Sequence, residues 1–200
     1  SAFTMVDSLL TQCNGTQGGG GMYIAAYNPG VSVINTTFYR CLASSEVSSA
    51  GGAIVLDRFN DDFLISGSLF DSCSTRFYGG ALASLNYNDN TIITRSEFRS
   101  CNGEYGGAVF VSQFMVGFSL SHSLVTGCNS FGGSGGGVYL LYDIDQVNIY
   151  NVTFRECTSA YHAGGLYLFV FVTDSAVIDC VFDSNSAMQT GGGMSTRFFN

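Results

Sequence analysis

The 200-residue chain carries 15 acidic side chains against seven cations, all of them Arg. Its net charge of −8 argues against nucleic-acid binding, which needs a basic surface. A hydrophobic content of 46% and a single Pro exclude a disordered or collagen-like chain. The longest apolar run, at residues 166–172, is too short for a membrane helix, so we predict no membrane insertion.

Read from the N-terminus, the chain repeats one pattern seven times. A step of small residues is followed eighteen residues later by an apolar anchor, and three residues after the anchor comes a cysteine in six of the copies. Successive anchors lie 27–32 residues apart, a spacing typical of a solenoid. The step is marked by Gly20, Gly52, Gly80, Gly107, Gly136, Gly164 and Gly192, and the anchors are Leu10, Phe38, Phe70, Phe98, Val125, Phe154 and Phe182.

Short alternating apolar runs predict the elements of each repeat. Residues 1–5 form the first expected strand, and in the second repeat Ile54 and Leu56 alternate with Val55. We predict two or three short strands per repeat and no helix. Two inward columns recur, Met22, Ile54, Leu82, Val109, Val138, Leu166 and Met194, and Met5, Val33, Ile65, Ile93, Leu120, Ile149 and Val177.

These patterns predict an all-β fold, a right-handed parallel β-helix of about seven coils that forms one domain over residues 1–200. Equivalent strands of successive coils would pair about 4.8 Å apart, and only the stack of coils would bury a core. The glycines mark places where the backbone has φ > 0 or approaches its neighbour closely. Length varies only between cysteine and glycine, so all variable loops would lie along one edge, with 42–50 the longest.

A second column of small residues lies two positions before the anchors and predicts a tight bend. It comprises Ser8, Thr36, Ser68, Ser96, Ser123, Val152 and Cys180.

The cysteines form a third column. Neighbours one strand spacing apart lie within the Cα range of a disulfide, so disulfides between coils and a buried ladder of free thiols both remain open. Without a CxxC pair or clustered His, we expect no zinc and no cofactor. The column contains Cys13, Cys41, Cys73, Cys101, Cys128 and Cys157, and the seventh copy has Asn185 there.

Three Asn-x-Ser/Thr sequences mark candidate N-glycosylation sites at Asn14, Asn35 and Asn151. Asn35 and Asn151 occupy the same column, three residues before the anchor, which we expect to face outward. We therefore predict covalent N-glycans if the protein is secreted, whereas ordinary surface asparagines are the alternative.

Acidic residues raise the alternative of catalysis. Asp61 and Asp89 share a column nine residues after the glycine, with Asp62 adjacent, and Asp143 and Asp145 follow two coils later. No cation repeats beside them, and His122 and His162 stand alone, so we predict no enzyme. An outward column three residues after the glycine is expected to be exposed and to mark an interface. It comprises Tyr23, Val55, Ala83, Phe110, Tyr139, Tyr167 and Ser195.

The steps Gly-Gly-Ala-Ile at 51–54, Gly-Gly-Ala-Leu at 79–82 and Gly-Gly-Ala-Val at 106–109 resemble repeats of polymorphic outer-membrane adhesins. Those repeats pair the step with FxxN, where this chain has FxxC, and residues 182–185 keep the Asn form. The resemblance implies a right-handed parallel β-helix with an adhesive or structural role at a cell surface. The usual crossover rule gives the same hand.

We predict an extracellular structural protein whose units stack head to tail into a glycosylated filament. The spacing of eighteen residues puts the anchor that follows Gly192 at position 210. Leu10 is the first anchor, so Leu10 of a second copy that follows residue 200 would fall at this position and continue the register. The alternatives are a surface adhesin that is part of a longer β-helix, with carbohydrate or a cell surface as partner, and a polysaccharide-active enzyme.

Overall fold

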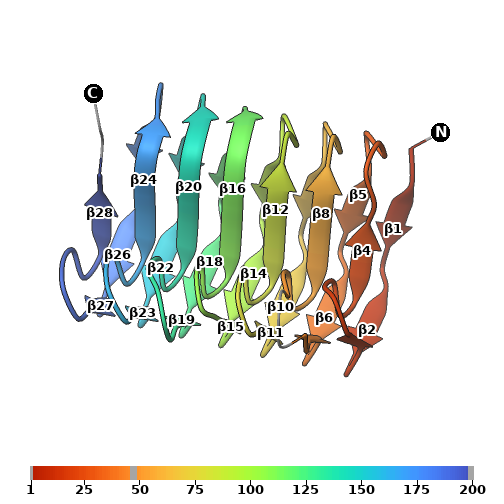
Figure 1. The fold of residues 1–200 in the computed structure, drawn as a ribbon, viewed down its shortest axis with the longest axis horizontal. Helices are drawn as coiled ribbons and strands as arrows, with labels where there is room; N and C mark the ends of the chain where they lie inside the picture. Colours follow the sequence, from red (N-terminus) through yellow and green to blue (C-terminus); the bar gives the residue numbers. More distant parts are fainter. Residues whose placement is uncertain (1, 46–48, 198–200) are drawn as a thin grey trace.

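The computed structural model describes residues 2–45 and 49–197. Within these residues there are 28 short strands and no helix, and the chain winds into stacked coils with its two termini at opposite ends of the rod (Figure 1). A coil here means one full turn of this winding. The predicted all-β parallel β-helix of about seven coils is confirmed. Of the long variable loop at 42–50, residues 46–48 lie outside the described part.

Two of the four sheets are built from three-residue strands. They contain one strand from every coil, in chain order along the rod. The first sheet contains β1 (Thr4–Val6), β5 (Ser32–Ile34), β9 (Leu64–Ser66), β13 (Ile92–Thr94), β17 (Ser119–Ser121), β21 (Asn148–Tyr150) and β25 (Ala176–Ile178). The second contains β2 (Leu9–Thr11), β6 (Thr37–Tyr39), β10 (Leu69–Asp71), β14 (Glu97–Arg99), β18 (Leu124–Thr126), β22 (Thr153–Arg155) and β26 (Val181–Asp183).

The other two sheets contain the shortest and the longest strands. The third contains β3 (Asn14–Gly15), β7 (Leu42–Ala43), β11 (Ser74–Thr75), β15 (Asn102–Gly103), β19 (Asn129–Ser130), β23 (Thr158–Ser159) and β27 (Ser186–Ala187). The fourth contains β4 (Met22–Ile24), β8 (Ile54–Arg58), β12 (Leu82–Asn86), β16 (Val109–Val116), β20 (Val138–Asp145), β24 (Leu166–Val172) and β28 (Met194–Thr196). Each coil therefore contributes four strands, and the prediction of two or three was wrong because it missed the third sheet. The two-residue strands of that sheet are too short to leave an alternating pattern.

All strand pairs are parallel and keep the predicted register. Phe70 pairs with Phe38 on one side and Phe98 on the other, and Leu82 pairs with Ile54 and Val109. Equivalent residues of successive coils therefore form continuous columns, as predicted for the two inward columns and the anchors.

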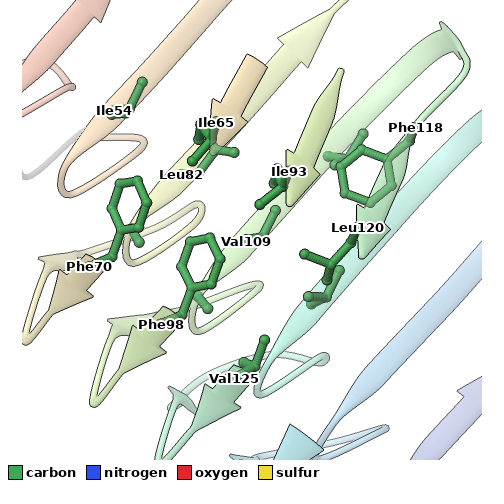
Figure 2. Close-up of a cluster of buried hydrophobic side chains, with 14 of the residues drawn as sticks. Ile54, Ile65, Phe70, Leu82, Ile93, Phe98, Val109, Phe118, Leu120 and Val125 are labelled. Carbon is green, nitrogen blue, oxygen red and sulfur yellow. The ribbon is translucent and has the colours of Figure 1, made fainter. Parts of the chain in front are cut away.

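The core is a stack of these columns inside the tube. Phe70 and Phe98 lie with parallel rings beside the aliphatic columns of Ile65 and Leu82 (Figure 2). Ring centroids are 4.9 Å apart from Phe38 to Phe70 and 4.8 Å apart from Phe70 to Phe98, close to the spacing between strands. The anchors of the five central coils are fully buried, so each coil contributes a layer that its neighbours cover.

The glycine step has two separate causes. Gly79 has a φ of +64°, in the left-handed region that side chains disfavour. Gly80 instead lacks space, because a Cβ built there would lie 2.0 Å from the carbonyl oxygen of Gly107 in the next coil. The glycine that marks the pattern is thus required by close packing between coils, and the residue before it makes the turn.

A ladder of hydroxyl groups lines the bend between the first and second sheets. The backbone N–H of Thr36 donates to Ser68 Oγ at 3.1 Å, and that of Ser68 donates to Ser96 Oγ at 3.2 Å. The next pair continues the pattern, from Ser96 N–H to Ser123 Oγ at 3.1 Å. The small residues expected at a tight bend also satisfy its buried backbone donors.

Candidate functional site

The six cysteines of the predicted column lie in line inside the tube as free thiols, and Cys180 is free as well. From Cys41 to Cys157, each thiol of the column donates to the carbonyl of the anchor in the preceding coil, as Cys73 Sγ does to Phe38 O at 3.4 Å and Cys101 Sγ does to Phe70 O at 3.5 Å. Burial raises the pKa of the Cys101 thiol, and hydrogen bonds with the neighbouring thiols raise it further. The structure therefore contains the thiol ladder and no disulfide between coils.

Asn185 shows why asparagine can take the place of cysteine at this position. Its Nδ2 donates to Phe154 O at 2.9 Å, the same kind of contact that the thiols make. Its Oδ1 also accepts the backbone N–H of Cys157 at 2.9 Å. Both side chains satisfy an anchor carbonyl one coil away, and asparagine adds an acceptor that a thiol provides only weakly.

The three candidate glycosylation sites all lie on the surface. Asn14, Asn35 and Asn151 are exposed. Asn35 and Asn151 have φ values of 48° and 52° at the bend between the first and second sheets, a conformation that asparagine tolerates better than most residues. Both residues are exposed and belong to one column, three residues before the anchors.

The acidic residues accept hydrogen bonds from the loops of neighbouring coils. Asp61 Oδ1 accepts the N–H of Asp89 at 3.1 Å, and Asp89 Oδ1 accepts the N–H of Val116 at 2.8 Å. Asp62 accepts a hydrogen bond from Asn90 Nδ2 at 3.0 Å, and Asp145 accepts one from the hydroxyl of Thr173. The predicted column exists, and its carboxylates link one coil to the next.

The remaining polar candidates lie apart from one another. Asp143 lies within β20 and has a φ of 52°, His122 packs edge-on against Tyr150, and His162 Nδ1 lies 2.7 Å from the Thr190 hydroxyl. Across residues 2–45 and 49–197, no three His, Cys, Asp or Glu side chains are grouped so as to hold a metal ion.

A ladder of three asparagines was not predicted from the sequence, and two of its members, Asn60 and Asn88, are buried. The N–H of Asn28 donates to Asn60 Oδ1 and that of Asn60 to Asn88 Oδ1, both at 2.9 Å. Asn88 Nδ2 in turn donates to Ser84 Oγ at 3.2 Å. The signal was present in the sequence column eight residues after the glycine, where three asparagines are followed by Met115, Ile144 and Val172 in the next three coils.

The outward column three residues after the glycine is largely buried, so the prediction of an exposed stripe was wrong. Val55 is 1% exposed and Tyr139 is 5% exposed. Side chains from the turns and from the fourth sheet pack against this column and form an outer layer with it. The outer layer consists of Ala50, Val55, Ala83 and Leu85 over two coils, and of Tyr105, Phe110, Tyr139, Leu141, Ala163, Tyr167 and Phe169 over the next three coils.

Tyr23, by contrast, is exposed at one end of the outer layer. A surface hollow of about 510 Å³ separates it from Tyr78, because the small Val55 and Ala50 form the floor there. In later coils the larger Phe110 and Tyr139 occupy the corresponding positions of the column.

A second group of aromatic side chains, the edge ladder, follows the far end of the fourth sheet. Rings from Tyr27, Phe59, Tyr87 and Phe114 are stacked with centroids 5.0, 5.1 and 5.2 Å apart. Tyr142 and Phe171 continue the ladder edge-to-face in the next two coils. Tyr27 is 72% exposed, and Phe59, Tyr87 and Phe114 are exposed as well.

Parallel strands from successive coils, closed around stacked side chains, define a parallel β-solenoid. The model of the family described as right handed beta helix region matches residues 27–198, and the chain belongs to that family. No curated protein and no solved structure matches the chain. The likeness to adhesin repeats stays a prediction, because the family match supports only the β-helix fold. In the described residues no helix is long and apolar enough to cross a membrane.

Proposed function

We propose that the chain is an extracellular structural rod that stacks head to tail into a glycosylated filament. The observation that supports this proposal is the apolar, half-open surface at both ends of the rod. Met5, Leu10 and Met22 are only partly buried at the N-terminal end, whereas equivalent residues of the central coils are fully buried.

The C-terminal end presents the same columns. Val177, Phe182 and Met194 pack against the core and are partly exposed. In each sheet the terminal strand has one unpaired edge, which favours pairing with another strand. A second copy would place Val177 over Met5 and Phe182 over Leu10, which are residues of matching column and chemistry.

Such a contact joins two different surfaces, so it does not close and leads to a filament. Each added unit would lengthen the rod by about 34 Å if the strand spacing of about 4.8 Å continues through the junction. Asn35 and Asn151 would carry glycans on the side of the rod, and Asn14 would carry one in β3, the terminal strand of the third sheet at the N-terminal junction.

The test uses two neighbouring leucines of β2. Leu10→Asp puts a charge into the end surface, whereas Leu9→Asp changes a side chain that is 67% exposed and points outward. We expect electron microscopy and sedimentation to show filaments for the wild type and for Leu9→Asp, and monomers for Leu10→Asp. The pair Phe182→Asp and Val181→Asp repeats the comparison at the other end.

A chain that stays monomeric at every concentration would contradict the proposal, and so would filaments that survive Leu10→Asp. The first result would be expected if further coils of a longer chain cover these ends. Circular dichroism of each variant checks that the central coils remain folded.

A surface adhesin is the second candidate, and the exposed edge ladder favours it. An exposed row of aromatic side chains is typical of binding surfaces. Binding to cells or glycans that survives Leu10→Asp but disappears with Tyr27→Ser and Tyr87→Ser would support the adhesin over the filament.

A further inference from the structure

Four tyrosine rings lie against one another in four successive coils. Ring centroids are 5.8 Å apart from Tyr78 to Tyr105, 6.0 Å from Tyr105 to Tyr139, and 5.1 Å from Tyr139 to Tyr167. The first ring is the most accessible, since Tyr78 is 38% exposed and Tyr167 is 2% exposed. Four phenols thus form one continuous row from the surface into the outer layer.

We propose that Tyr78 and Tyr105 are a site of oxidative cross-linking, where a haem peroxidase with hydrogen peroxide joins the two phenols into dityrosine. The bond would connect two neighbouring coils within one chain. This inference does not depend on head-to-tail stacking, because both residues lie near the middle of the rod.

The backbone holds the two rings in place. Tyr78 and Tyr105 are paired by a parallel bridge, and the N–H of Gly79 donates to Tyr105 O at 2.9 Å. The N–H of Tyr105 donates to Phe77 O at the same distance, and the ring planes are inclined by only 27°. Holding two reactants in such a geometry favours their reaction over encounters between separate chains at low protein concentration.

The reaction balances with peroxide as the oxidant. Each phenol loses one electron and one proton and becomes a phenoxyl radical. The two radicals join through a carbon–carbon bond between ring positions ortho to the oxygens, and the hydrogens on those carbons move to restore both hydroxyl groups. The two electrons and two protons reduce one hydrogen peroxide to two waters, so the chain loses two hydrogen atoms.

Tyr78 and Tyr105 differ from the other stacked tyrosines in the exposure of their rings and in the rings beside them. Tyr139 and Tyr167 are only 5% and 2% exposed, so an enzyme has little access to their rings, whereas Tyr78 is exposed and Tyr105 is half-buried. The edge ladder provides the contrast, because Tyr and Phe alternate along it. Tyr27 and Tyr87 are separated by Phe59, so neither phenol has another phenol stacked on it.

The experiment treats dilute, purified chain with a haem peroxidase and hydrogen peroxide. We expect the fluorescence of dityrosine in monomers and, after unfolding and trypsin digestion, a linked pair of peptides that covers 77–95 and 100–155 and is lighter by two hydrogen atoms. Tyr78→Phe and Tyr105→Phe each preserve a ring and should reduce this linked pair to background. Tyr87→Phe, in the same peptide as Tyr78, should leave it unchanged.

A gain of reaction completes the test. Phe59→Tyr completes a stack of three phenols in the edge ladder and should add a second link, from peptide 59–76 to 1–40 or 77–95. The proposal is overturned if Tyr78→Phe keeps the linked pair, if dityrosine forms only between chains, or if Phe59→Tyr adds no link.

Discussion

At the scale of single residues, the backbone of the next coil limits what each position can hold. Gly80 has no room for a side chain because the backbones of two neighbouring segments meet around it, at Gly107 O and at Asn102 N. Ala163 occupies the preceding turn position in a later coil and has a φ of 53°. The two positions lie next to each other in the repeat, so adding a methyl group at one and removing a methyl group at the other test the two causes separately.

We expect Gly80→Ala to lower the free energy of unfolding by about 1–3 kcal/mol or more, because the coil must shift to admit a Cβ. Ala163→Gly is the matched control and should change it by less than about 1 kcal/mol. Relief of the left-handed backbone strain is offset there by the loss of a buried methyl group. Urea unfolding measures both, and a Gly80→Ala midpoint equal to that of the wild type would contradict the packing argument.

At the scale of elements, the columns that could be predicted are those whose chemistry is constant. Anchors such as Phe70 and the thiols such as Cys101 recur at fixed distances and describe the inside of the tube directly. The third sheet could not be predicted, because β11 and its equivalents are only two residues long and their side chains vary.

The outer layer was missed for a related reason. The column that contains Tyr78 and Tyr105 reads Gly, Ala, Tyr, Tyr, Ser, His and Thr along the rod, so no periodic pattern marks it. Whether Val55 or Phe110 is exposed depends on these neighbours in space. Period-two alternation shows which side of a strand faces the core, but it cannot show that a second layer covers the opposite side.

The buried Cys101 thiol and the buried Tyr139 phenol should make the fold sensitive to alkali. Burial raises the pKa of Cys101 above its ordinary value of 9.0 and raises the pKa of Tyr139 above 10.0. Both groups therefore keep their protons in the folded state at a pH where the unfolded chain loses them. Their contribution to stability is complete below pH 9 and is lost progressively as the pH rises above it.

Urea unfolding at pH 7 and at pH 10 measures this effect, and the midpoint should be lower at pH 10. Cys101→Val cannot ionise and has a similar volume, so it should reduce the difference between the two midpoints. A midpoint that does not change with pH would contradict the assignment of a neutral, buried Cys101 thiol and Tyr139 phenol.

At the scale of the whole molecule, each coil contacts only its two neighbours. Stability in such a rod is approximately a sum over coils and interfaces, so the end coils have one interface fewer than the central ones. Figure 1 shows this arrangement, with β1 and β28 at the two extremes and β12 and β16 in the middle.

We expect amide hydrogen exchange in the monomeric Leu10→Asp variant to begin in β1–β4 and β25–β28 and to be slowest around β12 and β16. In wild-type chain at high concentration, stacking should slow exchange in the end coils specifically. Equal protection along the whole rod would contradict a nearest-neighbour description.

The parallel pairing of all four sheets also determines how the rod responds to force. The hydrogen bonds between coils run along the long axis, so tension along that axis loads every bond between two coils at the same time. The aromatic stack of Phe38, Phe70 and Phe98 shares the load inside the tube. A fibre made of such rods would be stiff in tension and would break cleanly between two layers, whereas a single chain pulled by one terminus would unwind one turn after another.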